Sequence, residues 1–243
     1  RSGAAMFLGG AILPSKLVAC VDYTASNSFL PWAEEDFSAY GHLPFLMRVE
    51  RRFFDAKTPL SYKPDFHLTP ATGIDAFAAS LEGERETLGK KIKGMIADKF
   101  LTSDTGEIHF DYATGVLTIN APRAQGAAGF LEAARTIDLG DLGIRCETPH
   151  ASILLVSLDG SPIHASARML LSAVGSSKNT GENTAEKKVG SLPILFDPVE
   201  ASLSLRSKKE LTIYPLDPFS GEGRDPLRVK KSGKNFDFRI GAK

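Results

Sequence analysis

The sequence has few cysteines, no excess of either charge and no apolar run of membrane-spanning length. Two cysteines among 243 residues exclude a multi-disulfide scaffold and a four-cysteine zinc site. The 29 basic and 29 acidic residues cancel, which leaves no strong field to attract nucleic acid or an anionic membrane. The longest nearly uninterrupted apolar stretch, residues 4–13, is roughly half of what a membrane span needs. We therefore expect neither nucleic acid nor a membrane as a partner.

The two cysteines, Cys20 and Cys146, leave the redox compartment open. They could form one disulfide bond or remain as two thiols, and the apolar or mixed runs around both of them favour buried thiols. So few cysteines fit a reducing compartment. They equally fit a large bacterial secreted protein that needs no covalent cross-links.

Short motifs of nucleotide-binding sites, serine hydrolases and zinc proteases are missing. The sequence contains no GxGxxG, no GxSxG and no HExxH. Its histidines lie far apart, without the spacing of metal ligands: His42, His67, His109, His150 and His164. The sequence therefore predicts neither a cofactor nor a metal site.

The apolar pattern changes near residue 102 and divides the chain into two regions. Before it, residues 16–23 are typical of a strand, and residues 74–81 and 83–100 have the apolar spacing of helices. After it, short apolar runs alternate with turn residues, as in antiparallel β-sandwiches. We predict a mainly β protein, with a mixed α/β region at 1–101 and a β-sandwich domain at 102–243. The polar residues 175–190 are predicted to form a surface loop.

Carboxylates offer the first catalytic candidates. Glycoside hydrolysis needs two of them, one on each side of the scissile bond. If residues 107–111 form a strand, Glu107, His109 and Asp111 share one face, and the two acids become candidate catalytic groups. The alternative is a solvated strand face, which we favour because nothing in the sequence removes water from either acid.

Aromatic rings offer a second carbohydrate signal, because the faces of sugars pack on exposed rings. Trp32 is the only tryptophan, and Tyr23 lies in the same loop-rich region. We consider both as candidate carbohydrate-binding residues. The favoured alternative is that Trp32 covers a core or a domain junction.

A resemblance to a known family enters at residues 103–107 (SDTGE). A strand and turn follow (HFDYATG), and then residues 116–130 (VLTINAPRAQGAAGF). This order resembles the C-terminal all-β portion of large bacterial glycoside-hydrolase-like proteins, in which a (β/α)-barrel of the retaining type precedes a sandwich. Residues 157–171 and 211–217 fit the same pattern, so that the resemblance covers about residues 102–240.

The resemblance implies a non-catalytic accessory domain that packs on an upstream catalytic barrel and contacts a polysaccharide or oligosaccharide. The family's catalytic acids lie on barrel strands, so none can be carried over to this chain. The resemblance also implies an extracellular or periplasmic location. The apolar opening at residues 3–10 leads us to expect that the fold continues upstream. A stand-alone glycosidase and a purely structural interdomain module remain as alternatives.

Within the family-like run, three polar residues have structural rather than catalytic roles to play. Pro122 ends a strand, after which Arg123 and Gln125 point to one face. We expect Arg123 to pair with Asp104 or Glu107 and so to join turn to strand. The small residues 126–129 (GAAG) let a second backbone approach closely.

Overall fold

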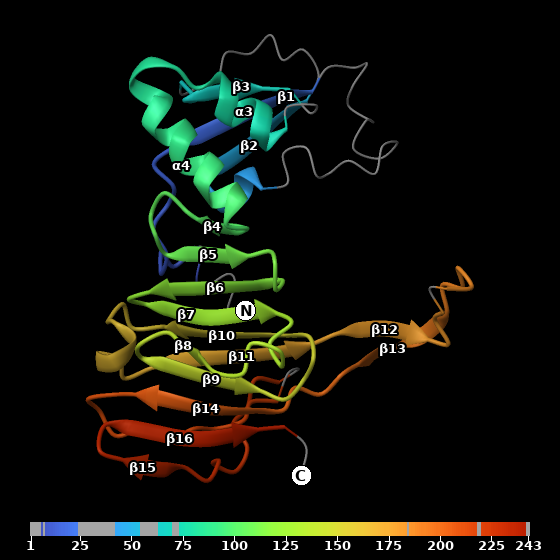
Figure 1. The fold of residues 1–243 in the computed structure, drawn as a ribbon. Helices are drawn as coiled ribbons and strands as arrows, with labels where there is room; N and C mark the ends of the chain where they lie inside the picture. Colours follow the sequence, from blue (N-terminus) through green and yellow to red (C-terminus); the bar gives the residue numbers. More distant parts are fainter. Residues whose placement is uncertain are drawn as a thin grey trace. The chain divides into compact units, whose positions relative to one another are not determined.

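The chain forms two compact units, which are described separately (Figure 1). The computed structural model describes residues 6, 8–23, 42–53, 63–69, 73–183, 185–217 and 220–241. One unit comprises Leu13–Ala113, and we call it the α/β unit; the other comprises Arg1–Ile12 and Thr114–Lys243, and we call it the β unit. The predicted boundary between residues 101 and 102 therefore falls inside the α/β unit. The predicted mainly β fold is confirmed.

A small parallel sheet is the centre of the α/β unit. Its strand order is β2-β1-β3, and both neighbours of β1 run parallel to it. Two helices and a short hairpin follow the sheet in the sequence. The elements are β1 (Val18–Tyr23), the 3-10 turn η1 (Leu43–Phe45), β2 (Arg48–Phe53), β3 (Phe66–Leu68), α3 (Ile74–Ser80), the 3-10 turn η2 (Gly83–Arg85), α4 (Glu86–Ala97), β4 (Phe100–Thr102) and β5 (Ile108–Asp111).

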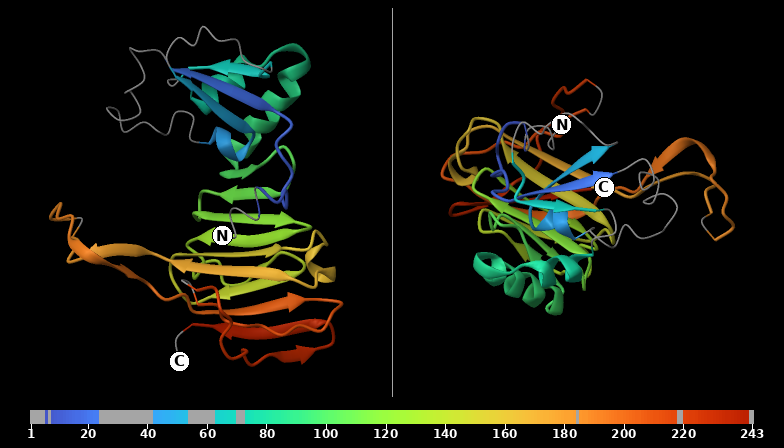
Figure 2. Two further views of the ribbon diagram at one scale, coloured as in Figure 1. Left: turned by 180° about the vertical axis from the view of Figure 1, so that it is seen from behind. Right: turned by 90° about the horizontal axis from the view of Figure 1, so that it is seen from above.

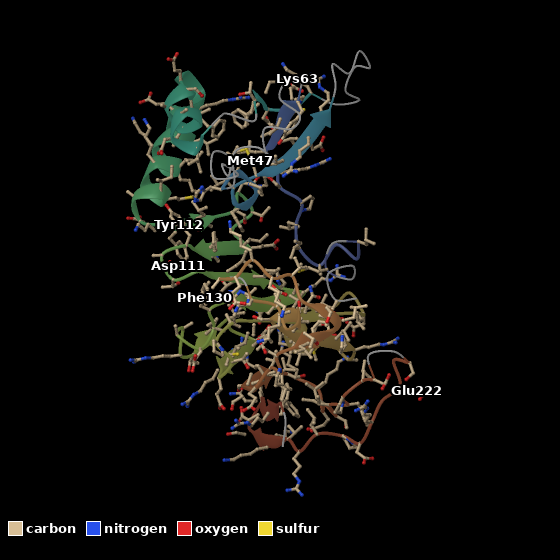
Figure 3. The ribbon with its side chains drawn as sticks, turned by 90° about the vertical axis from the view of Figure 1, so that its right-hand side faces the viewer. Met47, Lys63, Asp111, Tyr112, Phe130 and Glu222 are labelled. Carbon is tan, nitrogen blue, oxygen red and sulfur yellow. The ribbon has the colours of Figure 1, made fainter. Side chains whose placement is uncertain are left out.

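One face of this sheet packs against the helices (Figure 2). Alternate residues of β1 share that face, and Val21 lies in one buried cluster with Phe77 of α3 and Ile92 of α4. Met47 joins the same cluster inside the unit (Figure 3). The predicted strand at 16–23 and both predicted helices are thus confirmed, and each uses its apolar stripe for packing.

Two antiparallel sheets face one another in the β unit. One has the order β11-β10-β7-β6, and the other has the order β15-β16-β14-β9-β8. Ile153 of β10 and Leu203 of β14 belong to the same buried cluster, so the space between the sheets is a shared apolar core. The strands are β6 (Val116–Ala121), β7 (Ala124–Gly129), β8 (Ile137–Asp138), β9 (Leu142–Cys146), β10 (Ala151–Ser157), β11 (Met169–Gly175), β14 (Ala201–Arg206), β15 (Lys230–Ser232) and β16 (Asn235–Ile240).

Two predictions for the β unit were wrong. Within the predicted loop 175–190 lies the strand β12 (Ser177–Thr180), which pairs with β13 (Ser191–Phe196). Residues 211–216 are one of the short apolar runs that the alternating pattern predicts to be strands, but they form no named strand, and Leu211 and Ile213 pack against the sandwich core. The strand β12 was not predicted because its side chains are polar. The segment 211–216 resembles a strand in sequence because apolar side chains of a loop pack on the core.

Across the described ranges, none of the helices combines the length and apolar character that a membrane crossing requires. The helix α4 is amphipathic instead, with Ile92 buried and Lys90 and Lys93 exposed.

Candidate functional site

A cysteine, an aspartate and a histidine meet on the sheet face that points away from α3 and α4. Cys20 and Asp22 are two residues apart on β1 and therefore point to the same side. His67 of β3 stands directly opposite Cys20 in the parallel register. Arg52 of β2 stands opposite Asp22 in the same way. Strand pairing thus brings together side chains that the sequence keeps far apart.

Asp22 is the centre of the contacts in this cluster. Its Oδ1 accepts a hydrogen bond from Nε of Arg52 at 2.6 Å and one from the thiol of Cys20 at 3.6 Å. Its Oδ2 lies 3.2 Å from Nδ1 of His67. Cys20 is buried, whereas the side chains of Asp22 and Arg52 are 31% exposed and that of His67 is 55% exposed. In this cluster the sulfur atom is therefore shielded from water, whereas the imidazole ring of His67 is accessible to it.

The local charges act differently on the thiol and on the carboxyl group. Burial raises the pKa of Cys20, and the neighbouring carboxylate of Asp22 raises it further. Burial also acts to raise the pKa of Asp22, but the hydrogen bonds from Arg52 and His67 and the charge of Arg52 hold that pKa below its usual range. The thiol therefore keeps its proton at neutral pH, and the cluster does not supply an activated nucleophile.

The carboxylates of Glu107 and Asp111 each bind nearby backbone. Glu107 is buried, and its Oε2 accepts a hydrogen bond from the amide of Leu13 at 2.6 Å. Asp111 ends β5, and its Oδ1 accepts one from the amide of Ala113 at 3.0 Å (Figure 3). We expected Glu107 to be part of this strand, but β5 begins one residue later, at Ile108. Each acid thus has a structural role in fixing a loop.

Asp104 and Arg123 have other partners than the ones that we expected. Oδ2 of Asp104 accepts hydrogen bonds from the backbone amides of Lys16 and Leu17, at 2.6 and 3.0 Å. The guanidinium of Arg123 donates to the carbonyl oxygens at positions 9 and 10, both at 3.2 Å. Both residues therefore anchor loops through backbone groups, and the expected ion pair is replaced by these contacts.

Gln125 lies on β7 and is buried. Its Nε2 donates to Oδ1 of Asn120 at 2.9 Å and to the carbonyl oxygen of Leu139 at 2.7 Å. The side chain links the β6–β7 hairpin to the turn that precedes β9. Gln125 is thus a structural residue of the sandwich.

The aromatic candidates do not form a sugar platform in the part of the chain that the structure describes. Tyr23 is 2% exposed and belongs to the core of the α/β unit. It lies three residues after Cys20 on β1, and because side chains alternate along a strand, the two point to opposite sides of the sheet. Its ring therefore offers no free face to a ligand. Trp32 lies outside the described residues.

A two-stranded arm extends from the sandwich (Figures 1 and 2). The arm consists of β12 and β13, with Lys178 opposite Leu195 and Asn179 opposite Ile194. Every residue of β13 is exposed, and Leu192 and Phe196 are 79% and 67% exposed. Single exposed apolar residues are ordinary, but β13 carries a run of them, and such a run makes the strand a candidate interaction surface.

Comparison with known proteins finds no relative, so the cluster around Asp22 and the arm are interpreted from their own chemistry. No family model, no curated protein and no solved structure matches the chain.

The sequence alone predicted neither the cluster around Asp22 nor the exposed arm. The cluster depends on strand pairing over 45 residues, which no local spacing reveals. The apolar run 192–196 is one of the short strands that the alternating pattern predicts, but that pattern does not show that the strand is exposed.

Proposed function

We propose that this chain is a non-catalytic accessory module of a carbohydrate-active protein, and that its β12–β13 arm attaches it to a neighbouring catalytic barrel domain. The family resemblance of residues 102–240 motivates the carbohydrate context. The observation that carries the proposal is the exposure of every residue of β13. The same resemblance supports our proposal that the protein acts outside the cytoplasm.

The arm has the properties of a docking element. Ile194 and Phe196 lie two residues apart in the regular register of β13 and so share one face, and the exposed Leu192 follows Ser191 at the shift in that register. Burial of each such side chain contributes about 1.5–3 kcal/mol, so that burying all three would favour attachment to a neighbouring domain. An exposed apolar edge strand also invites aggregation, which a permanent neighbour would prevent.

The local roles of Glu107 and Asp111 support a module without catalysis of its own. A retaining or inverting glycosidase needs two carboxyl groups that face a sugar in a cleft. Glu107 instead holds the backbone of Leu13, and Asp111 holds that of Ala113. A stand-alone glycosidase therefore remains the alternative to be tested by assay.

The arm is tested first in the isolated chain. We expect it to be monomeric in sedimentation and to bind an apolar fluorescent dye. The triple variant Leu192→Ser, Ile194→Ser, Phe196→Ser should lose at least half of the dye fluorescence with an unchanged circular-dichroism spectrum. The control Leu158→Ser, at a separate exposed apolar residue, should keep it. If the triple variant binds the dye as well as the wild type, or if the wild type forms a dimer that the triple variant does not form, the proposal that the arm docks on another domain is wrong.

The carbohydrate role is tested separately. Affinity electrophoresis against a panel of soluble polysaccharides should retard the intact chain, and no reducing sugar should be released. Absence of retardation across the panel would leave the purely structural interdomain module. Release of reducing sugar that is lost in Glu107→Gln and Asp111→Asn would establish the glycosidase instead.

A further inference from the structure

The cluster on the sheet face that points away from α3 and α4 has the composition of a metal site. It combines a thiol, an imidazole and a carboxylate, from Cys20, His67 and Asp22. All three lie on β1 and β3, where these strands pair side by side. In open α/β sheets, ligands bind beyond the carboxyl ends of parallel strands, and Asp22 and His67 are both next to the last residue of their strands.

The spacing of the ligand atoms fits one small cation. The sulfur of Cys20, a carboxylate oxygen of Asp22 and a ring nitrogen of His67 all lie within 4.8 Å of one another. Sγ to Oδ1 measures 3.6 Å, and Nδ1 to Oδ2 measures 3.2 Å. Around tetrahedral zinc, with bonds of about 2.3 Å to sulfur and about 2.0 Å to nitrogen or oxygen, ligand atoms are separated by about 3.3–3.5 Å. Small shifts of three side chains are enough to close the site.

The donor set selects among metals. Thiolate and imidazole favour zinc and related transition metals over magnesium and calcium, which prefer oxygen ligands. Zinc binding replaces the thiol proton of Cys20, and this proton leaves to water as the Zn–S bond forms. Because the side chain of His67 is 55% exposed, the ion has a route from solvent.

Arg52 is the competitor of the metal. Its guanidinium neutralises Asp22 through the 2.6 Å hydrogen bond to Oδ1. A cation at the cluster has to share Asp22 with Arg52 and is repelled by its charge. Since the side chain of Arg52 is 31% exposed, it can turn into water when the ion enters.

We propose that Cys20, Asp22 and His67 bind one zinc ion, with the fourth coordination position open to water. The site does not depend on the accessory role, since it involves neither the arm nor a carbohydrate. It would join β1 to β3 and would make the stability of the α/β unit dependent on metal.

Cobalt is the probe, because a Co²⁺–thiolate bond gives a charge-transfer absorption that reports sulfur ligation. The untagged chain is stripped with a chelator, kept reduced and titrated with Co²⁺. We expect one equivalent to bind with this absorption and Zn²⁺ to displace it. Cys20→Ser should abolish the band, and His67→Gln should weaken binding at least tenfold. Cys146→Ser should behave as the wild type, since that thiol donates to the carbonyl oxygen of Thr148 in the other unit.

The variant Arg52→Gln separates a metal site from a purely structural cluster. It frees Asp22 and removes a positive charge, so we expect cobalt to bind several-fold more tightly. A cluster that merely holds the sheet together would show no thiolate band in the wild type. That result, a band that survives Cys20→Ser, or weaker binding in Arg52→Gln would overturn the proposal.

Discussion

At the scale of single residues, Asp159 shows how one carboxylate organises a turn. It follows β10, and its Oδ2 accepts a hydrogen bond from the amide of Ala167 at 2.7 Å. Its Oδ1 accepts from the amide of Ser161 at 3.0 Å and from the hydroxyl of Ser166 at 2.9 Å. The hydrogen bonds from the amides of Ala167 and Ser161 hold the pKa of Asp159 far below its usual range.

This depressed pKa predicts a pH-dependent effect of Asp159→Asn. The unfolded chain binds a proton at Asp159 near the ordinary aspartate pKa of 3.8, whereas the folded protein does so only at lower pH. The charge therefore stabilises the folded state above about pH 4, and this contribution declines as the pH falls toward the folded-state pKa. We expect the variant to be less stable than the wild type at pH 7.

Urea denaturation at several pH values measures the difference. The gap in unfolding free energy between wild type and Asp159→Asn should narrow between pH 5 and pH 2.5. Asp138→Asn serves as the control, since among the described residues Asp138 accepts one backbone hydrogen bond, from Gly140 at 2.8 Å. A gap that stays constant with pH would mean that the charge of Asp159 does not stabilise the turn.

At the scale of elements, two glycines of α4 should respond to alanine in opposite directions. Gly94 is exposed, and an added Cβ meets no atom within 4 Å, so Gly94→Ala should stabilise the protein by about 0.5–1 kcal/mol. Gly89 is buried against α3, where a Cβ would lie 2.7 Å from the carbonyl oxygen of Ala78. Gly89→Ala should therefore destabilise by about 1–3 kcal/mol. Thermal unfolding measures the change in stability of both variants. Equal changes in the two variants would contradict the close packing of α4 on α3 at Gly89.

The elements also show where sequence reasoning succeeds and where it ends. The helix α4 was predictable because Leu88, Ile92 and Met95 repeat with the period of its buried stripe. The strand β12 was not, because its Ser-Lys-Asn-Thr side chains all face water or its partner strand and carry no apolar alternation. Strand identity there comes from pairing with β13.

The candidate sites were harder to predict than the elements, for the same physical reason. Cys20 and His67 become neighbours through the register of β1 and β3, which is a property of tertiary structure. Tyr23 has the residue type of a sugar platform, but the alternation of β1 turns it into the core. Residue type suggests chemistry, and only the sheet determines which side chains can meet.

At the scale of the whole molecule, the arm is the feature that the isolated chain leaves unexplained. A folded unit gains nothing by holding Leu192 and Phe196 in water, and covering them requires a surface that the described residues do not provide. We propose that a neighbouring catalytic barrel domain supplies that surface.

Hydrogen–deuterium exchange of residues 191–196 tests this account most directly. The complete product of the gene is compared with the 243-residue chain under identical conditions. The account predicts that the gene encodes a (β/α)-barrel ahead of Arg1, and that the amides of β13 exchange at least tenfold more slowly in the complete product. A coding sequence that starts at or near Arg1, or equal exchange in the two proteins, would contradict it.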